Sequence, residues 1–505
     1  MRRWFRNLPF LVVMLWIAAG AMLLPGAMAF ATEDFRTGRV FLYAALLTMI
    51  GATLIGIATQ GTRAVPTERR QMVALVLAYL LLPLVLAIPM EQAVSATRFV
   101  NVYLDMVSAL TTTGAVIFEP ERLPPAVHLW RATVAWLGGL LIWVSAMAVL
   151  APLNLGGYEV TAEARIEGRI QMSLGQAGVR GADERLRRSA AQLTPVYVAL
   201  TLTLAFLLAL AGERPLVALI HAMSTLSTSG ITPVDGLEGR EVGVAGEGLI
   251  FLFLVFALSR RTFSGGFTRA WPSRVVQDRE VRLAAFAVIV LPTLLFARHW
   301  LGALEVDTVE NFAGALAALW GGAFTVLSFI TTTGFVSDSW ADARVWSGLE
   351  TPGLLLVGLV LMGGGVATTA GGVKLLRVYA LYKHGTREMG KLVHPHSVAG
   401  AGLLGRRIRR EGAYIAWIFF MLFVLSLGAV MLALAATGLG FEPALILSVA
   451  ALTTTGPLAE VAGAAPIAFG ALSDPAKLIL AAAMIVGRIE TLVLIALLNP
   501  AFWRA

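Results

Sequence analysis

Long hydrophobic runs separated by short polar stretches dominate the chain from its first residues. The run Leu8 to Phe30 contains 23 residues and follows three arginines, and a second run, Val40 to Thr59, comes directly after it. About 20 consecutive apolar residues are enough to cross a bilayer as a helix, so both runs predict transmembrane helices. The first run ends in AMAFA and can also be interpreted as a cleaved signal peptide. Its length favours a retained span.

The rest of the chain repeats one order four times: a long apolar run, a short apolar run, a Ser/Thr/Gly string and a second long run. The short runs cannot cross a bilayer, whereas most of the long ones can. We therefore predict an all-α polytopic membrane protein with ten transmembrane helices, in which four helix–pore-loop–helix repeats surround a pseudo-fourfold pore. The expected first helices are 72–90, 193–211, 283–297 and 413–436, the pore helices end at 110 or lie in 215–226, 311–330 and 443–452, and the second helices are 132–150, 249–258, 352–380 and 476–498.

These repeats predict five sections of the chain. A nearly charge-balanced stretch, 158–192, is expected to form a solvated amphipathic helix on the cytoplasmic side. The expected sections are 1–62 (two leading helices), 63–155 (repeat 1), 156–275 (cytoplasmic segment and repeat 2), 276–390 (repeat 3) and 391–505 (repeat 4).

The four polar strings have nearly the same spelling. They read MVSALTTTGA, AMSTLSTSGI, VLSFITTTGF and VAALTTTGP, and their glycines lie 116, 104 and 122 residues apart (230−114, 334−230, 456−334). One such string would be a common turn, but four in equivalent places indicate a repeated function. The candidate filter residues are Thr111, Thr112, Thr113, Gly114, Ser227, Thr228, Ser229, Gly230, Thr331, Thr332, Thr333, Gly334, Thr453, Thr454, Thr455 and Gly456.

The residue types in these strings suit cation binding. A cation that loses its water needs a ring of oxygens, which backbone carbonyls supply without net charge. Glycine permits the positive φ that turns carbonyls toward an axis, and hydroxyl groups add dipoles. Non-helical backbone at membrane depth is tolerated only where it is buried in protein or lines a wet cavity. The strings therefore predict a selectivity filter.

Composition and charge support a membrane protein. The 505 residues are 58% hydrophobic and 14% charged, with no cysteine and therefore no disulfide or thiolate metal site. The formal charge of +8 does not indicate nucleic acid, because the basic excess lies in alternate loops: six basic residues against two acidic in 259–282 and nine against two in 373–412. By the positive-inside rule these loops are cytoplasmic. The opposite loops contain acids that either concentrate cations at an outer vestibule or only solvate the loops: Asp235, Glu238, Glu241, Glu247, Asp338, Asp342 and Glu350.

Filters, topology and loop charges together resemble the Trk/Ktr/HKT superfamily of potassium transporters, most closely its TrkH branch. In this superfamily serine at the first filter glycine accompanies Na⁺ permeation, whereas this chain has glycine in all four filters. The resemblance implies uptake of K⁺, bound at the filter residues, through a channel-like pore with a wide inner cavity. It also implies no enzyme activity, no cofactor in this chain, a homodimer, and a cytoplasmic ring of subunits that bind NAD, ATP or ADP. The location would be the bacterial inner membrane, with a cytoplasmic N-terminus.

Two further stretches match the superfamily. The resemblance implies that GGGVATTAGGVK (363–374) is an intramembrane gate loop, although such small residues could also serve close helix packing. In Gly487-Arg488-Ile489-Glu490, Arg488 would face the pore below the filter. Glu490 stands about 200° further round a helix and would pair with another helix. The candidate gate residues are Gly363, Gly364, Gly365, Thr368, Thr369, Gly371, Gly372, Lys374 and Arg488.

Other signals are weaker or leave alternatives open. The first repeat departs from the superfamily at Leu140 and Leu141, where a glycine-methionine step is usual. Asp105, near the end of the first pore helix, could bind the filter backbone or offset the charge of the ion. The GxGxxG at 400–405 has no preceding strand, and the histidine pair at 394 and 396 has no further ligand nearby, so neither predicts a nucleotide or metal site.

Three alternative functions belong to different classes. A symporter that couples K⁺ to H⁺ or Na⁺ would need a titratable relay, for which Asp105 and Glu490 are the candidates. The pore subunit of a K⁺-pumping ATPase would share the fourfold plan. A membrane enzyme acting on lipid would need a catalytic cluster at one interface, and the sequence shows none.

Overall fold

The regular secondary structure in the described part of the chain is entirely helical, with no strand. Four of the predicted features lie wholly or largely outside the described residues. They are the amphipathic stretch 158–192, of which only 182–192 is described, most of the basic loop 259–282, the acidic residues at 235–241, and the motifs at 394–405. The computed structural model describes residues 9–59, 68–151, 182–234, 243–259, 275–303, 312–347, 353–393 and 410–490.

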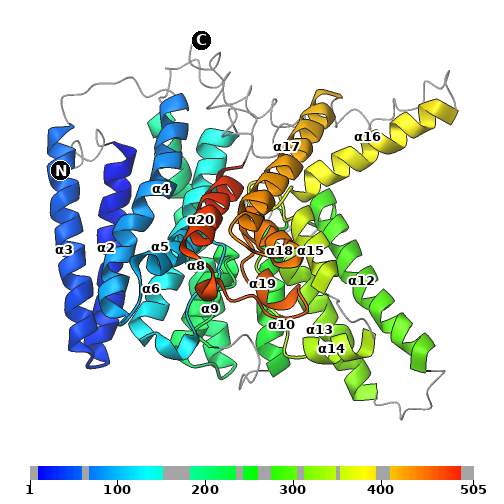
Figure 1. Ribbon diagram of the computed structural model, residues 1–505, viewed down its shortest axis with the longest axis horizontal. Helices are drawn as coiled ribbons and strands as arrows, with labels where there is room; N and C mark the ends of the chain where they lie inside the picture. The colour runs from blue at the N-terminus through cyan, green and yellow to red at the C-terminus, as the bar shows by residue number, and fades with distance from the viewer. Residues whose placement is uncertain are drawn as a thin grey trace.

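The two leading helices, α2 (Phe10–Ala31) and α3 (Phe35–Ala58), lie side by side at one edge of the molecule (Figure 1). The Asp34 carboxylate caps α3 by accepting the Thr37 N–H, and hydrogen bonding from the Thr37 side chain and backbone lowers the pKa of Asp34. The ring of Phe41 meets the ring of Trp130 edge-on at 5.7 Å, which attaches this pair of helices to the first repeat.

Each repeat has the expected order, with one interruption. The long helix after the first filter ends in five residues of π-helix, and the corresponding helix of repeat 3 is broken at 363–374 into two helices. Repeats 1 and 2 consist of α4 (Glu68–Ala93), α5 (Phe99–Leu110), α6 (Pro125–Ser145), η2 (Ala146–Leu150), α8 (Ala182–Leu210), α9 (Pro215–Ser227), α10 (Gly243–Leu254) and η4 (Val255–Ala257). Repeats 3 and 4 consist of α12 (Arg279–Ala303), α13 (Phe312–Ile330), α14 (Trp340–Ser347), α15 (Gly353–Met362), α16 (Leu375–Val393), α17 (Arg410–Ala435), α18 (Phe441–Leu452), α19 (Leu458–Val461) and α20 (Asp474–Ile489).

Seven helices of the described part are long and apolar enough to span a membrane: α2, α3, α4, α6 with its π turn, α8, α12 and α17. The second helices of repeats 2 to 4 are shorter within the described residues, so the count of ten spans stays a prediction. The last helix was expected to continue to residue 498, but the described helix ends at Ile489. The next residue, Glu490, has φ 71° and is the last one described.

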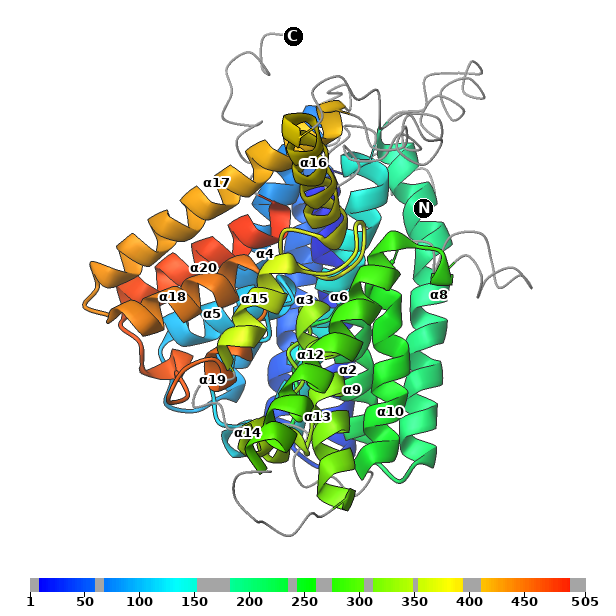
Figure 2. The same cartoon turned by 90° about the vertical axis from the view of Figure 1, so that its right-hand side faces the viewer.

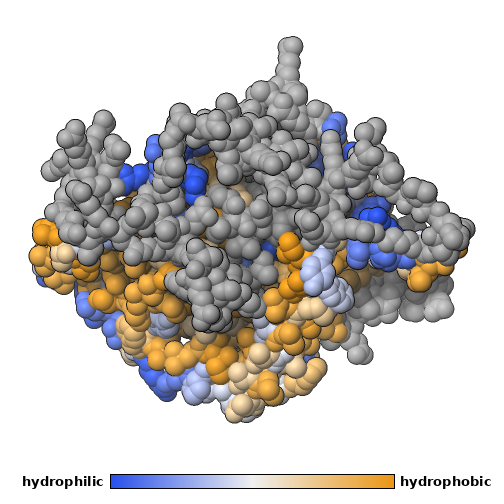
Figure 3. All heavy atoms as spheres, turned by 90° about the horizontal axis from the view of Figure 1, so that it is seen from above, coloured by the Kyte–Doolittle hydropathy of each residue, from blue (hydrophilic) through white to orange (hydrophobic). Residues whose placement is uncertain are grey.

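The outer surface is apolar where lipid would cover it. Large hydrophobic side chains on four peripheral helices are strongly exposed, and from above hydrophobic side chains gather along the outer edge of the molecule (Figure 3). Such exposure is costly in water and costs nothing in a bilayer. The helix after the break in repeat 3, α16, extends outward at the upper right of Figure 1 and lies near the top of the molecule in Figure 2. Examples of exposed side chains are Leu47, Phe206, Ile289 and Leu432.

Candidate ion-conduction site

The four filter strings adopt nearly the same backbone at the ends of their pore helices. The residue just before each filter glycine donates its N–H to the carbonyl five residues earlier, at 2.7–3.0 Å. The central threonine is left-handed in every copy, an unusual conformation for a β-branched residue. The φ values are 54° at Thr112, 54° at Thr228, 56° at Thr332 and 54° at Thr454.

The filter glycines connect the repeats in cyclic order. A Cβ atom at Gly114 would stand 2.9 Å from the Ser229 carbonyl carbon of filter 2, and one at Gly230 would press on the Thr333 carbonyl of filter 3. At Gly334 it would stand 2.9 Å from Pro457 in filter 4. Real Cβ atoms essentially never come within 3.0 Å of such neighbours, so only glycine fits.

Filter 4 closes the ring in a different way. A Cβ atom at Gly456 would stand 2.5 Å from Ala115 Cα, and the Gly456 N–H donates to the Thr113 carbonyl at 2.6 Å. Positive φ occurs at the other three filter glycines, 68°, 67° and 86° in chain order, but not at Gly456. The expectation of positive φ is therefore wrong for Gly456, where the close approach of filter 1, and not the backbone angle, requires glycine.

The filters leave oxygens free of protein hydrogen bonds. Within the described residues no backbone N–H donates to the carbonyl oxygens of the four central threonines. The buried hydroxyls of Thr112 and Thr454 also have no partner there, while the Thr332 hydroxyl accepts the N–H of Gly371 at 2.7 Å. Oxygens whose lone pairs are not used by a hydrogen-bond donor can coordinate a dehydrated cation in place of its water.

A buried ion pair supports the first filter. Arg131 on α6 donates through Nε to both oxygens of Asp105 on α5, at 3.1 and 2.9 Å, and reaches the Ala115 carbonyl at 3.4 Å. The Ser108 hydroxyl accepts the Ala115 N–H at 2.7 Å. Of the two interpretations offered for Asp105, neither holds directly, because its carboxylate binds an arginine that in turn contacts the filter end.

Filter 2 has a second buried polar pair beside it. His221 on α9 joins the Glu213 carboxylate, 2.8 Å from Nδ1, to the Thr232 hydroxyl, 3.0 Å from Nε2. The ring of Phe335, just after filter 3, meets the imidazole edge-on. The sequence analysis named Asp105 but not its partner Arg131, which lies just before the predicted span 132–150, and it missed the pair of His221 and Glu213. A histidine inside the predicted pore helix 215–226 is a usable signal.

For Glu247 alone, the expectation of an exposed residue in an acidic outer loop is wrong. Its side chain is 2% exposed and accepts hydrogen bonds from Trp320 Nε1 at 2.7 Å, the Ser337 hydroxyl at 2.8 Å and the Asp338 N–H at 2.8 Å. This carboxylate joins α10 to the segment after filter 3. It neither lines a vestibule nor solvates a loop, because its lone pairs are consumed by protein donors.

The segment 363–374 lies directly against the filters. The Gly371 N–H binds the filter 3 threonine, and a Cβ atom on Gly371 would stand 2.5 Å from the Thr454 hydroxyl of filter 4. The Thr369 hydroxyl donates to the Leu226 carbonyl at 3.2 Å, just before filter 2. The loop thus contacts three filter regions at once.

Residues 365 and 366 of the loop form hydrogen bonds with repeat 2 and with α12. The Gly365 N–H donates to the Ala257 carbonyl at 3.1 Å, and the Val366 N–H donates to the Glu280 carboxylate at 2.8 Å. Lys374 folds back so that its ammonium donates to the Ala370 carbonyl. Glu280, and Arg377, which donates to the Val373 carbonyl at 3.4 Å, are further residues in contact with the loop that the sequence analysis did not identify.

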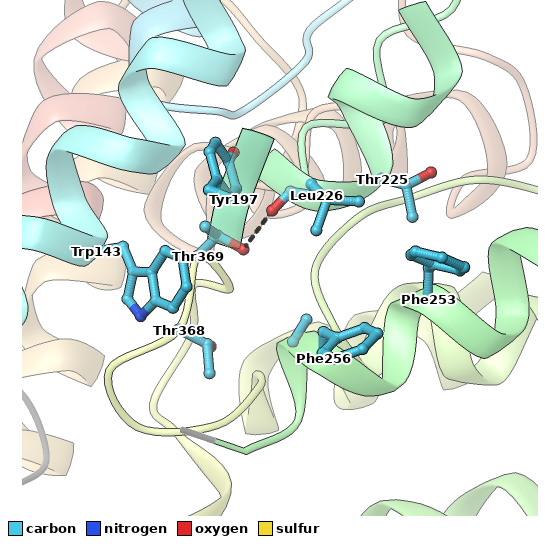
Figure 4. A pocket seen from close by; sticks show the side chains of 9 residues that line it. Trp143, Tyr197, Thr225, Leu226, Phe253, Phe256, Thr368 and Thr369 are labelled. Atoms are coloured by element: carbon cyan, nitrogen blue, oxygen red, sulfur yellow. Dashed lines mark hydrogen bonds between the residues drawn. The ribbon is translucent and has the colours of Figure 1, made fainter. Parts of the chain in front are cut away.

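Four aromatic side chains line a small cavity next to Thr368 and Thr369 of the loop. Figure 4 shows Trp143, Tyr197, Phe253 and Phe256 around Thr369, whose hydroxyl points to the Leu226 carbonyl. The cavity between them has a volume of about 10 Å³, and a second cavity, lined by Lys374 and Arg488 among others, has about 30 Å³. In this conformation the loop therefore adjoins two small cavities.

Arg488 is joined to the same loop. Its Nη1 donates to the Thr369 carbonyl at 2.6 Å, and a Cβ atom on the preceding Gly487 would stand 2.8 Å from the Leu452 carbonyl carbon. Glu490 pairs with Arg377 of α16 at 2.8 Å. The prediction that Glu490 forms an ion pair with another helix is confirmed.

These features define a class: a polytopic membrane protein in which four oxygen-rich loops meet in a ring and a fifth loop lies against them. The model of the TrkH family, described as "Cation transport protein", matches residues 276–503. The chain is 32% identical over 412 residues to the Trk system potassium uptake protein TrkH of Vibrio parahaemolyticus, covering 80% of each, and 29% identical over 497 residues to that of Salmonella typhimurium, covering 96% of each.

Structure comparison agrees with sequence comparison. The fold matches the crystal structure of the potassium transporter TrkH from Vibrio parahaemolyticus with a TM-score of 0.80 at 26% identity, covering 99% of this chain and 100% of that one. The chain belongs to the TrkH family, as the filter strings indicated. It is a multi-pass bacterial membrane protein of a transporter family.

Proposed function

We propose that this chain takes up K⁺ through the ring of its four filters. The observation that carries the proposal is the cyclic contact of filters 1 to 2, 2 to 3, 3 to 4 and 4 to 1, made by the four glycines. The relatives that cover most of the chain are potassium uptake proteins by name. A closed ring of carbonyls can replace the hydration shell of an ion, and an open row cannot.

The candidate filter residues would act mainly through their backbones. The carbonyls of the central threonines have no N–H donor within the described residues, so they remain available to K⁺. The hydroxyls of Thr112 and Thr454 add oxygens at the same level of two repeats. The ion pair of Asp105 and Arg131 would keep filter 1 from collapsing inward when no ion is bound, because Arg131 contacts the Ala115 carbonyl.

The segment 363–374 would be the gate, here in a closed position. Opening requires breaking five polar contacts of the loop: Gly371 to Thr332, Thr369 to Leu226, Gly365 to Ala257, Val366 to Glu280, and Arg488 to Thr369. Arg488 would also raise an electrostatic barrier to a cation leaving the filter, since it is 4% exposed and charged. Withdrawal of the loop would remove the steric obstacle and would release Arg488 from the Thr369 carbonyl.

The paired state of the candidate relay residues favours a channel-like pore over coupled transport. Asp105 is bound by Arg131 and Glu490 by Arg377, so neither carboxylate is poised to exchange protons along the pore. A pump subunit is disfavoured by the match to Trk system proteins over 96% of the chain. Co-purification with a P-type ATPase would reverse that conclusion.

Assembly and orientation rest on the family resemblance and on loop charge. The proposal includes a homodimer, a cytoplasmic ring of nucleotide-binding subunits, and an inner-membrane location with the N-terminus inside. Mass determination in detergent and co-purification from the native membrane test the first two. Labelling of single cysteines introduced at exposed positions tests orientation cleanly, because the chain has no cysteine of its own.

The test of function is Rb⁺ or K⁺ flux into liposomes that contain the purified full-length chain. We expect flux that is selective for K⁺ over Na⁺ and independent of a proton gradient. Flux that occurs only with a proton gradient would make the protein a symporter. Equal flux of K⁺ and Na⁺ would contradict the assignment of the filter.

A further inference from the structure

The chain leaves filter 4 in a different way from the other three filters. Filters 1 to 3 are followed by non-helical chain, whereas α19 begins two residues after Gly456. The residue between them, Pro457, is buried and caps this helix with φ −59°, close to the angle that a proline ring imposes. The Leu458 N–H donates to the Thr455 carbonyl at 3.2 Å, and the Ala459 N–H donates to the Gly456 carbonyl at 3.0 Å. These hydrogen bonds direct the two outermost carbonyls of filter 4 into the turn.

The matching carbonyls of the other filters are not used in this way. In the part of the chain that the structure describes, no backbone N–H donates to the carbonyl of Gly114, Gly230 or Gly334. At the level of the filter glycines, three repeats can therefore offer a carbonyl oxygen to an ion, while the fourth has turned its own into a helix end. The outer end of the filter thus has an oxygen lining on three sides only.

The ring of Pro457 reaches two other filters. A Cβ atom at Gly230 and one at Gly334 would each stand 2.9 Å from Pro457 Cγ. This Cγ atom therefore lies within about 4.4 Å of both glycine Cα atoms (2.9 Å plus a C–C bond of about 1.5 Å). Filter 3 is the neighbour of filter 4 in the cyclic order, but filter 2 is opposite to it. A side chain that starts from filter 4 and touches both lies across part of the opening.

We propose that Pro457 is a specificity-determining residue, whose apolar ring narrows the outer end of the pore and makes an entering cation give up water there. Water in an apolar constriction loses hydrogen-bond partners, so a hydrated ion passes it poorly. Na⁺ holds its water more tightly than K⁺ and is hindered more. The inference rests on the proposed passage of K⁺ through the filters. Pro457 follows its filter glycine, whereas the gate loop contacts Thr332 and Thr454, which precede theirs, so the two lie on opposite sides of the glycine ring.

A purely conformational role for Pro457 makes a different prediction. Proline fixes φ and lacks an N–H, which suits the start of a helix without any contact of its side chain. Alanine and valine at this position both lose these two properties. Valine keeps two γ carbon atoms, however, and alanine keeps none. Pro466, which is exposed between α19 and α20, provides the matched control.

The test is paired K⁺ and Na⁺ flux into liposomes that contain the full-length chain. Pro457→Ala should lower the K⁺/Na⁺ flux ratio about 10-fold, the lower end of what one fitted methylene group contributes to discrimination, and Pro457→Val should stay within about 2-fold of the wild type. Pro466→Ala should leave the ratio unchanged. Equal losses in Pro457→Ala and Pro457→Val would show that only the backbone matters, and an unchanged ratio in Pro457→Ala would equally overturn the proposal.

A second measurement needs no variant. Crystals of the wild type soaked in Rb⁺ should show anomalous density at the ring of central threonine carbonyls and no Rb⁺ bound to the Gly456 carbonyl. Rb⁺ on that carbonyl would overturn the proposal even if the Pro457 variants fail to fold. The absence of K⁺-selective flux in the wild type, or of Rb⁺ from all four filters, would instead contradict the proposed function before any variant is compared.

Discussion

Gly371→Ala is the sharpest test of the gate loop. This glycine does not have positive φ, so alanine carries no backbone penalty there. The new methyl group would stand 2.5 Å from the Thr454 hydroxyl and nearer still to the Thr453 carbonyl. Both oxygens belong to filter 4, so the substitution pushes the loop away from the filter without removing any hydrogen-bonding group.

The size of the effect follows from this distance. Ordinary contact begins at 3.4 Å, so the loop must move by at least 0.9 Å (3.4−2.5) to admit the methyl group. Overpacking of this kind costs about 1–3 kcal/mol, and the cost falls only on the conformation in which the loop touches the filter. Since 1.4 kcal/mol is a factor of ten, the ratio of open to closed molecules should rise about 5- to 150-fold. Basal K⁺ flux should rise in proportion until the pore is mostly open.

The assay is initial Rb⁺ uptake into liposomes at equal amounts of folded protein. Gly358→Ala on α15 is the control, because no atom lies within 4 Å of the position its Cβ would take. It should leave uptake unchanged. If Gly371→Ala unfolds no more readily than the control yet shows wild-type or lower uptake, the loop is not the gate or its position here is not the closed one.

The remaining predictions concern the filters and their supports. Gly114→Ser places a Cβ atom 2.9 Å from the Ser229 carbonyl carbon at φ 68°, so it should admit Na⁺ and lose K⁺ preference in flux measurements; an unchanged K⁺/Na⁺ ratio would contradict the filter assignment. Asp105→Asn leaves Arg131 buried without its counter-charge and should destabilise the protein by about 3–5 kcal/mol in thermal unfolding, and Arg131→Met in addition should recover part of that loss; simple additivity of the two would argue against a coupled pair. Glu247→Gln keeps the shape of the side chain but weakens three hydrogen bonds, so it should lower the free energy of unfolding by more than about 1 kcal/mol. A smaller decrease in thermal unfolding measurements would show that the charge of Glu247 is unimportant.

Local sequence patterns determine the helices, the break in repeat 3 and the filter backbones of this protein. The lengths of the apolar runs predict the helices because a bilayer requires about 20 apolar residues and admits no unpaired backbone. The break in the second helix of repeat 3 follows from glycine and threonine at 363–374, and the equivalent filter strings follow from their common spelling. These features depend on neighbours in the chain, so a sequence without structure can reveal them.

The partners of single polar groups depended on the tertiary structure. Glu247 has the charge of a vestibule residue in the sequence, but its three donors come from residues 320 to 338, which the fold brings next to α10. Gly456 needs glycine because filter 1 lies against it, and Glu490 finds Arg377 across 113 residues of chain. The sequence determines the backbone of each filter through short-range hydrogen bonds, whereas the ring and the loop that lies against it arise only when distant repeats pack together.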